Sequence, residues 1–304
     1  MRIFRHIAPA EAPVVLAIGN FDGVHRGHQA ILTRLRECAA AEGMVSTVMT
    51  FEPHPREFFS PATAPTRLTS LREKLELFDA AGIERVVLCR FNRQFAGIGA
   101  QDFMREVLLK MRVRRMLVGE DFRFGASRSG GLDDLRGAGF AVESLPDVLV
   151  DGVRVSSTAI REALAVGDLA LAERLLGRTY SISGHVAHGD KLGRQLGYPT
   201  ANIYMLHERP PLFGIYAVKL SGLGERDLPG VASLGVRPTM KQDAKPLLEV
   251  HLFDFEGDIY GRHVRVHFLK KLRDEAKFPN LEALKRQIAA DEQAARDYFK
   301  NQHD

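Results

Sequence analysis

Residues 19–29 read Gly-Asn-Phe-Asp-Gly-Val-His-Arg-Gly-His-Gln, and this stretch decides the fold of the first half of the chain. It follows the apolar residues 14–18, whose length and composition are typical of a buried parallel strand. Apolar residues then recur at helical spacing between positions 31 and 39, and Gly43 is a helix-ending residue. The sequence therefore predicts a strand that passes directly into a helix, which is where open α/β sheets bind phosphate-bearing ligands.

The two histidines of this stretch, His25 and His28, lie at the expected start of the helix. Imidazoles there can donate hydrogen bonds to a phosphate whose charge grows while a nucleophile attacks and pyrophosphate leaves. The plainer alternative is a turn histidine beside a helix cap, and the pattern His-x-Gly-His alone does not separate the two. The flanking strand, helix and glycines favour the catalytic role. The other residues expected near the phosphate are Gly19, Phe21, Asp22 and Gly27.

The composition is that of an ordinary globular protein, with 45% hydrophobic and 26% charged residues and a formal net charge of +4. A chain of 304 residues is long enough for two domains. The weak basic balance suits anionic small molecules, and no run of Lys and Arg indicates a nucleic-acid partner. Cys38 and Cys89 are too few for a disulfide framework or a Cys-based zinc site, so we expect buried thiols in a reducing compartment.

No apolar stretch approaches the length of a membrane span, and the first residues do not open a signal peptide. We therefore expect a cytoplasmic protein without a membrane partner. We expect it to be a monomer or a weak homo-oligomer.

Strands and helices alternate between residues 14 and 120, which predicts an α/β domain with a Rossmann-like, doubly wound parallel sheet. The Gly-x-Gly-x-x-Gly fingerprint and the P-loop pattern are missing, which argues against an NAD enzyme and a Walker-type kinase. Residues 126–139 are rich in glycine and polar residues, so a mobile surface loop is expected there. A short helix is expected from Asp168, as its N-cap, to Gly177.

The character of the sequence changes near residue 180, where helical periodicity nearly disappears. Short alternating strands with Gly and Pro between them suggest a small antiparallel β-barrel. These strands are expected at 180–187, 215–220, 248–255 and 263–268, and a final amphipathic helix at about 280–299. We therefore expect two domains, residues 1–180 and 181–304.

A second polar group of the first domain comprises Arg154, Ser157, Thr158 and Arg161, around the start of an expected helix. Hydroxyl and guanidinium groups at a helix start can hold the phosphates that leave as pyrophosphate. The alternative is an ordinary N-cap.

Gly189, Gly193 and Gly197 fall close together in the second domain, which suits a loop that binds phosphates through its backbone N–H groups. Directly afterwards, Thr200 and Asn202 point to one face if the chain is extended there, and their oxygen atoms are suitable Mg²⁺ ligands. The alternative is a Gly-rich hairpin in which Thr and Asn satisfy the turn backbone.

Glu249 and His251 share one face of a later expected strand. The glutamate could accept a proton from an attacking hydroxyl group. An exposed strand glutamate without a chemical role is the commoner situation.

The pattern Gly-Asn-Phe-Asp-Gly-Val-His-x-Gly-His at 19–28 resembles the bacterial bifunctional riboflavin kinase/FAD synthetase family, within the His-x-Gly-His nucleotidyltransferases. Three further segments are similar to that family. They are Ser-Ser-Thr-x-x-Arg at 156–161, Gly-x-x-x-Gly-Tyr-Pro-Thr-Ala-Asn at 193–202 and Glu-x-His at 249–251. The resemblance covers nearly the whole chain.

The resemblance implies that the barrel transfers the γ-phosphate of ATP to riboflavin, giving FMN, with Mg²⁺ and with Glu249 as the base. It implies that the first domain transfers AMP from a second ATP to FMN, giving FAD and pyrophosphate, with residues 156–161 gripping the phosphates. It also implies flavin-contacting residues, which are Pro53, His54 and Pro55, then Asp121 (where some members carry Asn) and Phe124, and finally Arg273.

Two alternatives stay open. A nucleotidyltransferase for another phosphate acceptor would carry a barrel that only binds flavin as a regulatory domain, yet such a barrel has no need of paired metal ligands and a base. A flavin-sensing or RNA-binding regulator would have no need of His25, His28 or Asn202, all of which are present.

Overall fold

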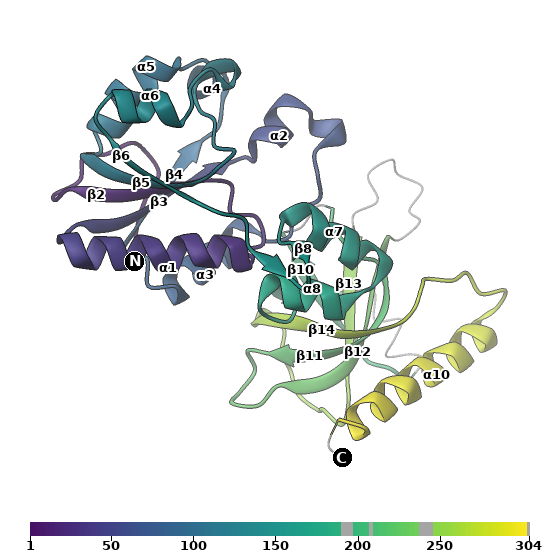
Figure 1. The fold of residues 1–304 in the computed structure, drawn as a ribbon. Coiled ribbons are helices and arrows are strands. Elements are labelled where there is room, and N and C mark those ends of the chain that lie inside the picture. The colour runs from purple at the N-terminus through teal and green to yellow at the C-terminus, as the bar shows by residue number, and fades with distance from the viewer. Residues whose placement is uncertain (190–196, 207–208, 237–245, 303–304) are drawn as a thin grey trace. The chain divides into compact units, whose positions relative to one another are not determined.

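The computed structural model describes residues 1–189, 197–206, 209–236 and 246–302. The chain divides into two compact units, one made of Met1–Pro65 with Leu71–Ser156 and the other of Thr66–Ser70 with Ser157–Asp304 (Figure 1). The helices between residues 157 and 176 group with the second unit. The expected domain boundary near residue 180 stays a prediction.

The first unit is built on a six-stranded parallel sheet with the strand order β1-β4-β3-β2-β5-β6. The apolar residues 14–18 form the interior strand β2, and all of them are buried. The strands are β1 (Arg2–Phe4), β2 (Val14–Ile18), β3 (Val45–Glu52), β4 (Arg85–Arg90), β5 (Val113–Gly119) and β6 (Ala141–Leu145). The parallel α/β sheet predicted from the sequence is confirmed.

Helices cover both faces of this sheet, because alternate residues of β2 are buried on opposite sides. Val15 and Ala17 pack in a core with α1 and α3, whereas Leu16 packs with Phe103 and Val107 on the other side. The sheet is therefore doubly wound, as expected. The helices of this unit are α1 (Arg26–Glu42), α2 (Pro55–Phe59), α3 (Leu71–Ala80), α4 (Arg93–Ala96), α5 (Ala100–Asp102), the π-helix η2 (Phe103–Leu109) and α6 (Leu132–Gly137), with 3₁₀ turns η1 (Pro61–Thr63) and η3 (Ala126–Arg128); a small hairpin joins β7 (Leu149–Val150) to β8 (Val153–Arg154).

The segment 126–139, expected to be a loop, contains the helix α6, so that part of the prediction was wrong. The helix begins where the Asp134 carboxylate accepts a hydrogen bond from the Gly131 N–H at 2.8 Å. Leu135 then packs in the core of the unit and is completely buried. A single apolar residue among glycines and polar residues is too weak a pattern to predict a helix.

The second unit contains a closed, six-stranded antiparallel barrel with the strand order β10-β13-β12-β11-β14-β9 (Figure 1). Tyr216, Val218 and Phe268 are fully buried, and the Tyr216 hydroxyl donates a hydrogen bond to the Phe213 carbonyl oxygen at 2.9 Å. The elements are α7 (Ser157–Val166), α8 (Leu169–Leu176), β9 (Ser181–Ala187), β10 (Ala201–Met205), β11 (Gly214–Ser221), β12 (Leu228–Val236), β13 (Pro246–Leu252), β14 (His263–Arg273) and α10 (Leu281–Lys300).

The expected barrel and C-terminal helix are confirmed, but β10 and β12 were not expected as strands. Pro229, Gly230 and Gly235 interrupt the apolar alternation of β12, which hides it from the sequence pattern. The short helix α8 agrees with expectation: Asp168 caps it by accepting a hydrogen bond from the Leu171 N–H at 2.9 Å.

Cys38 and Cys89 are both free and buried, as expected. Burial raises the pKa of the Cys89 thiol to about 12, so it stays protonated near neutral pH. Within the described part of the chain, no helix has the length and apolar character needed to cross a lipid bilayer.

Replacing Leu16 of β2 by Ala should destabilise the first unit, because this side chain is fully buried in its core. We expect the free energy of unfolding of the unit to fall by about 2 to 5 kcal/mol. Leu109→Ala is the matched control, since Leu109 is 58% exposed, and should change it by less than about 0.5 kcal/mol. Native-state hydrogen exchange of the β2 and β3 amides measures both changes, and equal effects would contradict the core assignment.

Candidate active sites

The turn between β2 and α1 brings His25 and His28 (the histidine pair) into direct contact. His25 is the N-cap of α1, and its Nδ1 accepts a hydrogen bond from the His28 backbone N–H at 3.3 Å. The two imidazole rings stack with their centroids 3.6 Å apart and their planes 16° from parallel. Left-handed backbone at Phe21, Gly23 and Val24 turns the chain sharply ahead of the pair.

The cap hydrogen bond decides where a neutral His25 ring carries its proton. Because Nδ1 is used as an acceptor, the proton is on Nε2. Nε2 is then a hydrogen-bond donor, as stabilisation of an anionic phosphate requires. Helix capping and phosphate binding, the two interpretations of this histidine from the sequence, are therefore compatible.

The other residues expected near the phosphate lie in the same turn and keep it compact. A Cβ atom at Gly27 would lie 3.3 Å from the His25 ring, and one at Gly19 would lie 3.2 Å from the Phe21 ring. Asp22 is 5% exposed, so its carboxylate belongs to the interior of the turn. The motif therefore leaves little room for larger side chains around the histidines.

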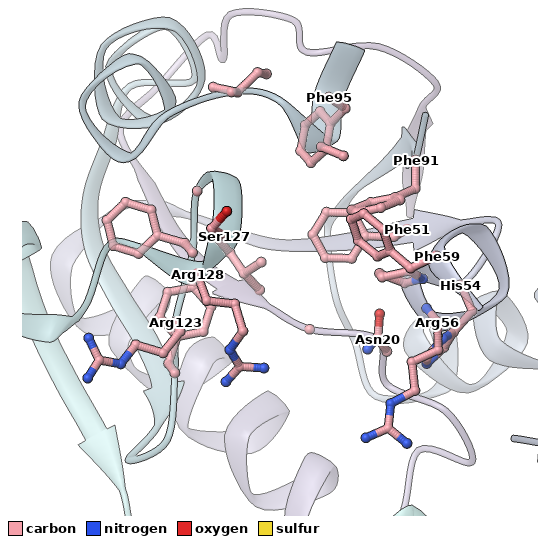
Figure 2. Close-up of a pocket in the computed structure, with 18 of the residues that line it drawn as sticks. Asn20, Phe51, His54, Arg56, Phe59, Phe91, Phe95, Arg123, Ser127 and Arg128 are labelled. Atoms are coloured by element: carbon pink, nitrogen blue, oxygen red, sulfur yellow. The ribbon is translucent and has the colours of Figure 1, made fainter. Parts of the chain in front are cut away.

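A cavity of about 650 Å³ in the first unit is lined by Gly19 and Asn20 of this turn (Figure 2). It is here called the flavin cavity after the residues that the sequence predicts to contact flavin. Four of the residues expected to contact flavin also line it, namely His54, Pro55, Asp121 and Phe124. Pro53 is not among the lining residues. His54 is held in place because its Nδ1 accepts a hydrogen bond from the Arg56 N–H at 3.1 Å.

One wall of the flavin cavity is a group of phenylalanines, of which Phe91 and Phe95 were not predicted from the sequence. The ring centroids of Phe51, Phe91 and Phe95 lie 5.7 to 5.8 Å apart, and Figure 2 shows the three side chains together. Phe103 and Phe124 add a further pair, 5.4 Å apart. Rings at these separations suit a flat aromatic ligand. The available signal was the aromatic segment Phe-Asn-Arg-Gln-Phe at 91–95, directly after β4.

Asn20 is another residue of the flavin cavity to which no role was assigned from the sequence. Its side chain faces the cavity (Figure 2), and its Oδ1 is buried without a hydrogen-bond donor among the described residues. An unpaired buried acceptor costs about 1 to 3 kcal/mol, so one at a cavity wall points to a donor on a ligand. Its place in the motif, between Gly19 and Phe21, was the available signal.

Arg154, expected to bind phosphate, pairs with Asp147 at 2.7 Å and with Asp121 at 3.3 Å. Hydrogen bonds to these carboxylates, Asp147 first and Asp121 second, raise the pKa of Arg154. The three side chains are between 54% and 86% exposed. Exposed pairs contribute little stability, so Arg154 can exchange them for an anionic ligand.

Ser157 and Thr158 begin α7, and Arg161 lies one turn further along it. The Arg161 Nε donates a hydrogen bond to the Thr66 carbonyl oxygen at 2.5 Å. These residues belong to the second unit, whereas the histidine pair belongs to the first. The prediction that they act at one site with the histidines stays a prediction.

A second cavity, of about 360 Å³, is lined by strands of the barrel and by α10, and is here called the barrel cavity. Thr200, Glu249 and Arg273, all expected site residues, line it together. Strand pairing places Glu249 opposite Asn202 of β10 on one side and opposite Ser233 of β12 on the other. Segments that are far apart in the sequence therefore meet at this cavity.

The backbone at Gly189 passes directly over the Asn202 amide, which is in a side chain with only 9% exposure. A Cβ atom at 189 would overlap the Asn202 side-chain amide, so a larger residue there would require Asn202 to move. Gly197 has a left-handed φ of 89°, and Gly193 lies outside the described residues.

The donor set of Thr200 and Asn202 fits Mg²⁺ only in company with other oxygen ligands. A hydroxyl and an amide oxygen are hard ligands of the kind that Mg²⁺ takes beside ATP phosphates. Among the residues that the structure describes, no group of three or more His, Cys, Asp or Glu is placed to bind a metal by itself. Thr200 and Asn202 would therefore supply only part of the ligand set of such a metal.

Arg273, expected to contact flavin, joins β14 to α10. Its guanidinium donates two hydrogen bonds to the Asp291 carboxylate, at 2.8 and 2.6 Å, and lies 5.6 Å from the Phe278 ring centroid. Asp291 is 7% exposed, so the pair is shielded from water on one side. Arg273 therefore forms part of the wall of the barrel cavity and also contributes a positive charge to it.

Glu275 is a further carboxylate of the barrel cavity that was not assigned from the sequence. It lies against the backbone of Gly235, where any Cβ atom would overlap the carboxylate. Burial raises the pKa of Glu275. The first cavity can thus hold a flat aromatic ligand beside a phosphate-binding helix start, and the second can hold a hydroxyl-bearing ligand beside carboxylates.

Two family models match the chain, FAD synthetase over residues 7–159 and riboflavin kinase over residues 176–299. The bifunctional riboflavin kinase/FMN adenylyltransferase of Escherichia coli K12 is 50% identical over 297 residues, covering 96% of this chain and 94% of the relative. The corresponding protein of Pseudomonas fluorescens is 49% identical over 301 residues, covering 97% of this chain and 96% of the relative.

A crystal structure described as a macrolide-efflux protein from Streptococcus pneumoniae is similar in fold, with a TM-score of 0.83 and 30% identity. The similarity covers 97% of this chain and 98% of that one. Matches along both halves leave no support for a transferase of another acceptor with a purely regulatory barrel. The chain belongs to the bifunctional riboflavin kinase/FMN adenylyltransferase family, and the riboflavin kinase and FAD synthetase halves follow one another along it.

Proposed function

We propose that the two activities take place at the two cavities described above, each with its own ATP. Riboflavin kinase chemistry is assigned to the barrel cavity, and FMN adenylylation to the turn that carries the histidine pair, with the flavin cavity beside it. The observation that carries this proposal is the capped and stacked histidine pair in a turn whose first residues, Gly19 and Asn20, line a cavity of aromatic rings.

In the barrel, Glu249 accepts the proton of the riboflavin 5′-hydroxyl while that oxygen attacks the γ-phosphorus of ATP and ADP leaves. Thr200 and Asn202 would hold Mg²⁺, which when bound neutralises charge on the ATP phosphates. Riboflavin lies in the cavity beside Arg273. Gly189, Gly193 and Gly197 are assigned to phosphate binding through their backbone N–H groups, although Gly193 lies outside the described residues.

In the first unit of the chain, an oxygen of the FMN phosphate attacks the α-phosphorus of ATP. The bond between that phosphorus and the bridging oxygen breaks, and pyrophosphate is released. His25 and His28 donate hydrogen bonds to the α-phosphate as its charge grows. The backbone of the turn approaches the nucleotide at Gly19, Phe21, Asp22 and Gly27. The departing pyrophosphate is held by Arg154, Ser157, Thr158 and Arg161.

The flavin ring of FMN occupies the flavin cavity. Phe51 and Phe91 contact its faces and edges, while Asn20 Oδ1 accepts a hydrogen bond from a flavin N–H or a ribityl hydroxyl. Pro53 shapes the loop that carries the lining residues His54 and Pro55. Asp121 and Phe124 complete the opposite wall.

We place this enzyme in the cytoplasm, acting on ATP, riboflavin and FMN without a nucleic-acid or membrane partner. Its domains are residues 1–180 and 181–304, and it acts as a monomer or a weak homo-oligomer. Sedimentation velocity over a range of concentrations measures that state.

The proposed function is tested by a time course with purified protein, riboflavin, ATP and Mg²⁺, separated by chromatography. FMN should appear first and FAD afterwards, because FMN is the product of one step and the substrate of the other. FMN alone would leave the first domain with another acceptor. FAD from supplied FMN, with riboflavin untouched, would reduce the barrel to a binding module.

Replacing His28 by Ala should lower FAD formation from FMN by about a hundredfold or more, because one donor to the α-phosphate is lost. His28→Asn, which keeps a donor of similar reach, should recover part of that loss. Riboflavin phosphorylation by the same protein is the internal control and should keep its rate. Loss of both activities would refute independent sites.

Replacing Glu249 by Gln should lower riboflavin phosphorylation by about 10²- to 10⁴-fold, because the proton acceptor is lost.

Asn202→Ala should also slow phosphorylation and raise the Mg²⁺ concentration that phosphorylation needs. The matched control is Glu256→Gln, at an exposed glutamate of the same unit, which should change neither quantity. A normal kinase rate and metal requirement in Asn202→Ala would rule out its role as a ligand.

A further inference from the structure

We propose that Arg56, Arg123 and Arg128 (the arginine rim) form an anion-binding edge of the flavin cavity and make it select flavin that carries a phosphate. This inference rests on the proposed function, because it takes the flavin cavity as the site of FMN. All three arginines line the cavity, and none is needed to explain the transfer chemistry at the histidine pair.

The arginine rim is assembled from two separate parts of the chain. Arg56 belongs to α2, whereas Arg123 and Arg128 belong to the segment that follows β5. In Figure 2 the guanidinium groups lie toward the end of the cavity at which Asn20 is seen, and Phe95 lies at the other end. Asn20 leads into the turn with the histidine pair, so the positive end of the cavity is the end at which a flavin phosphate would meet ATP.

The arginine rim has no carboxylate partner among the described residues. None of its side-chain nitrogens lies within 4.0 Å of a described Asp or Glu oxygen. The one carboxylate among the lining residues is that of Asp121, which pairs with Arg154 at 3.3 Å. Guanidinium groups without carboxylates, at the edge of an aromatic cavity, match a ligand with an anionic group at one end of a flat ring system.

The backbone at Arg128 is held in an unusual conformation, and Arg123 is packed closely against the chain. Ser127 and Arg128 are successive left-handed residues, with φ angles of 53° and 58°. A Cβ atom at Gly131 would lie 2.9 Å from Arg123 Nη1, so this guanidinium packs directly on the backbone. Left-handed conformations in residues other than glycine persist only where the surrounding structure enforces them, and they concentrate at ligand sites.

A selective anion site is needed here because riboflavin and FMN differ only in the 5′-phosphate. The phenylalanine wall contacts the ring that both molecules share, so it cannot separate them. Riboflavin is the substrate of the other activity of the same chain, and in the flavin cavity it would form a dead-end complex without a phosphate nucleophile. Guanidinium groups at the phosphate end add affinity for FMN alone, and they offset its repulsion from the ATP triphosphate.

The test compares two constants of FMN adenylylation in the full-length protein. They are the KM for FMN and the inhibition constant of 5′-deoxyriboflavin, a neutral flavin that cannot be phosphorylated. Arg123→Gln combined with Arg128→Gln should raise the KM by about tenfold or more and leave the inhibition constant unchanged, because only FMN offers a charged partner. If both constants rise together, or if neither changes, the proposal is wrong.

Arg93→Gln is the matched control, because Arg93 is exposed in the same unit but does not line the flavin cavity. It should change neither constant, and an effect equal to that of the double variant would reduce the proposal to a general charge effect. Native-state hydrogen exchange of the β2 and β3 amides in each variant reports that the first unit has folded.

Phe91→Ala separates failure of this inference from failure of the proposed function. It should raise both constants, because the ring contact serves both flavins. If Phe91→Ala changes neither the KM for FMN nor the inhibition constant, the cavity is not the flavin site. The proposed selectivity of the arginine rim is then wrong as well. If the wild-type protein forms no FAD from FMN, the proposed function itself is refuted before any variant is made.

Discussion

The hydrogen bond from the His28 N–H to His25 Nδ1 is the contact on which the first site depends. It caps α1 and, in the same contact, decides which nitrogen of the His25 ring carries the proton. Because the ring accepts at Nδ1, it donates at Nε2, and the stacking distance of 3.6 Å places the second imidazole alongside. Gly27 makes this possible, since a Cβ atom there would lie 3.3 Å from the ring. The same atoms therefore determine the local fold of the turn and the direction in which the neutral His25 ring can donate a hydrogen bond.

Strand register has the same importance in the barrel. Pairing of Asn202 with Glu249, and of Glu249 with Ser233, aligns three polar side chains across β10, β13 and β12. A slip of one residue would turn Glu249 to the interior, where its neighbours Leu248 and Val250 are now fully buried. A closed barrel offers no free edge at which such a slip would be tolerated. Packing of the apolar residues inside the barrel thus fixes the positions of Asn202, Glu249 and Ser233 on its outer face.

The candidate residues of both sites could be named from the sequence where they lie in continuous motifs, because such a motif is recognisable without knowledge of the fold. The part of the flavin cavity formed by Phe91 and Phe95 could not, since these residues come from a separate segment and each ring taken alone is typical of a core residue. The partner of Arg273 could not be predicted for the same reason. Asp291 lies in a different element, and its position in the sequence is typical of a solvent-exposed helix residue. Contacts between separate elements could therefore not be predicted from the sequence, whereas groupings of residues within one turn could.

The charges that line the two cavities differ, and under the proposed function this difference matches two successive flavin reactions. Carboxylates of Glu249, Glu275 and Asp291 line the barrel cavity, and the one guanidinium there, from Arg273, is already paired with Asp291. The remaining negative charge suits neutral riboflavin and disfavours retention of its phosphorylated product. The flavin cavity has the opposite excess, three arginines against one carboxylate, and attracts that product. Under the proposed assignment of the two reactions, this difference favours release of FMN from the barrel cavity and its binding in the flavin cavity.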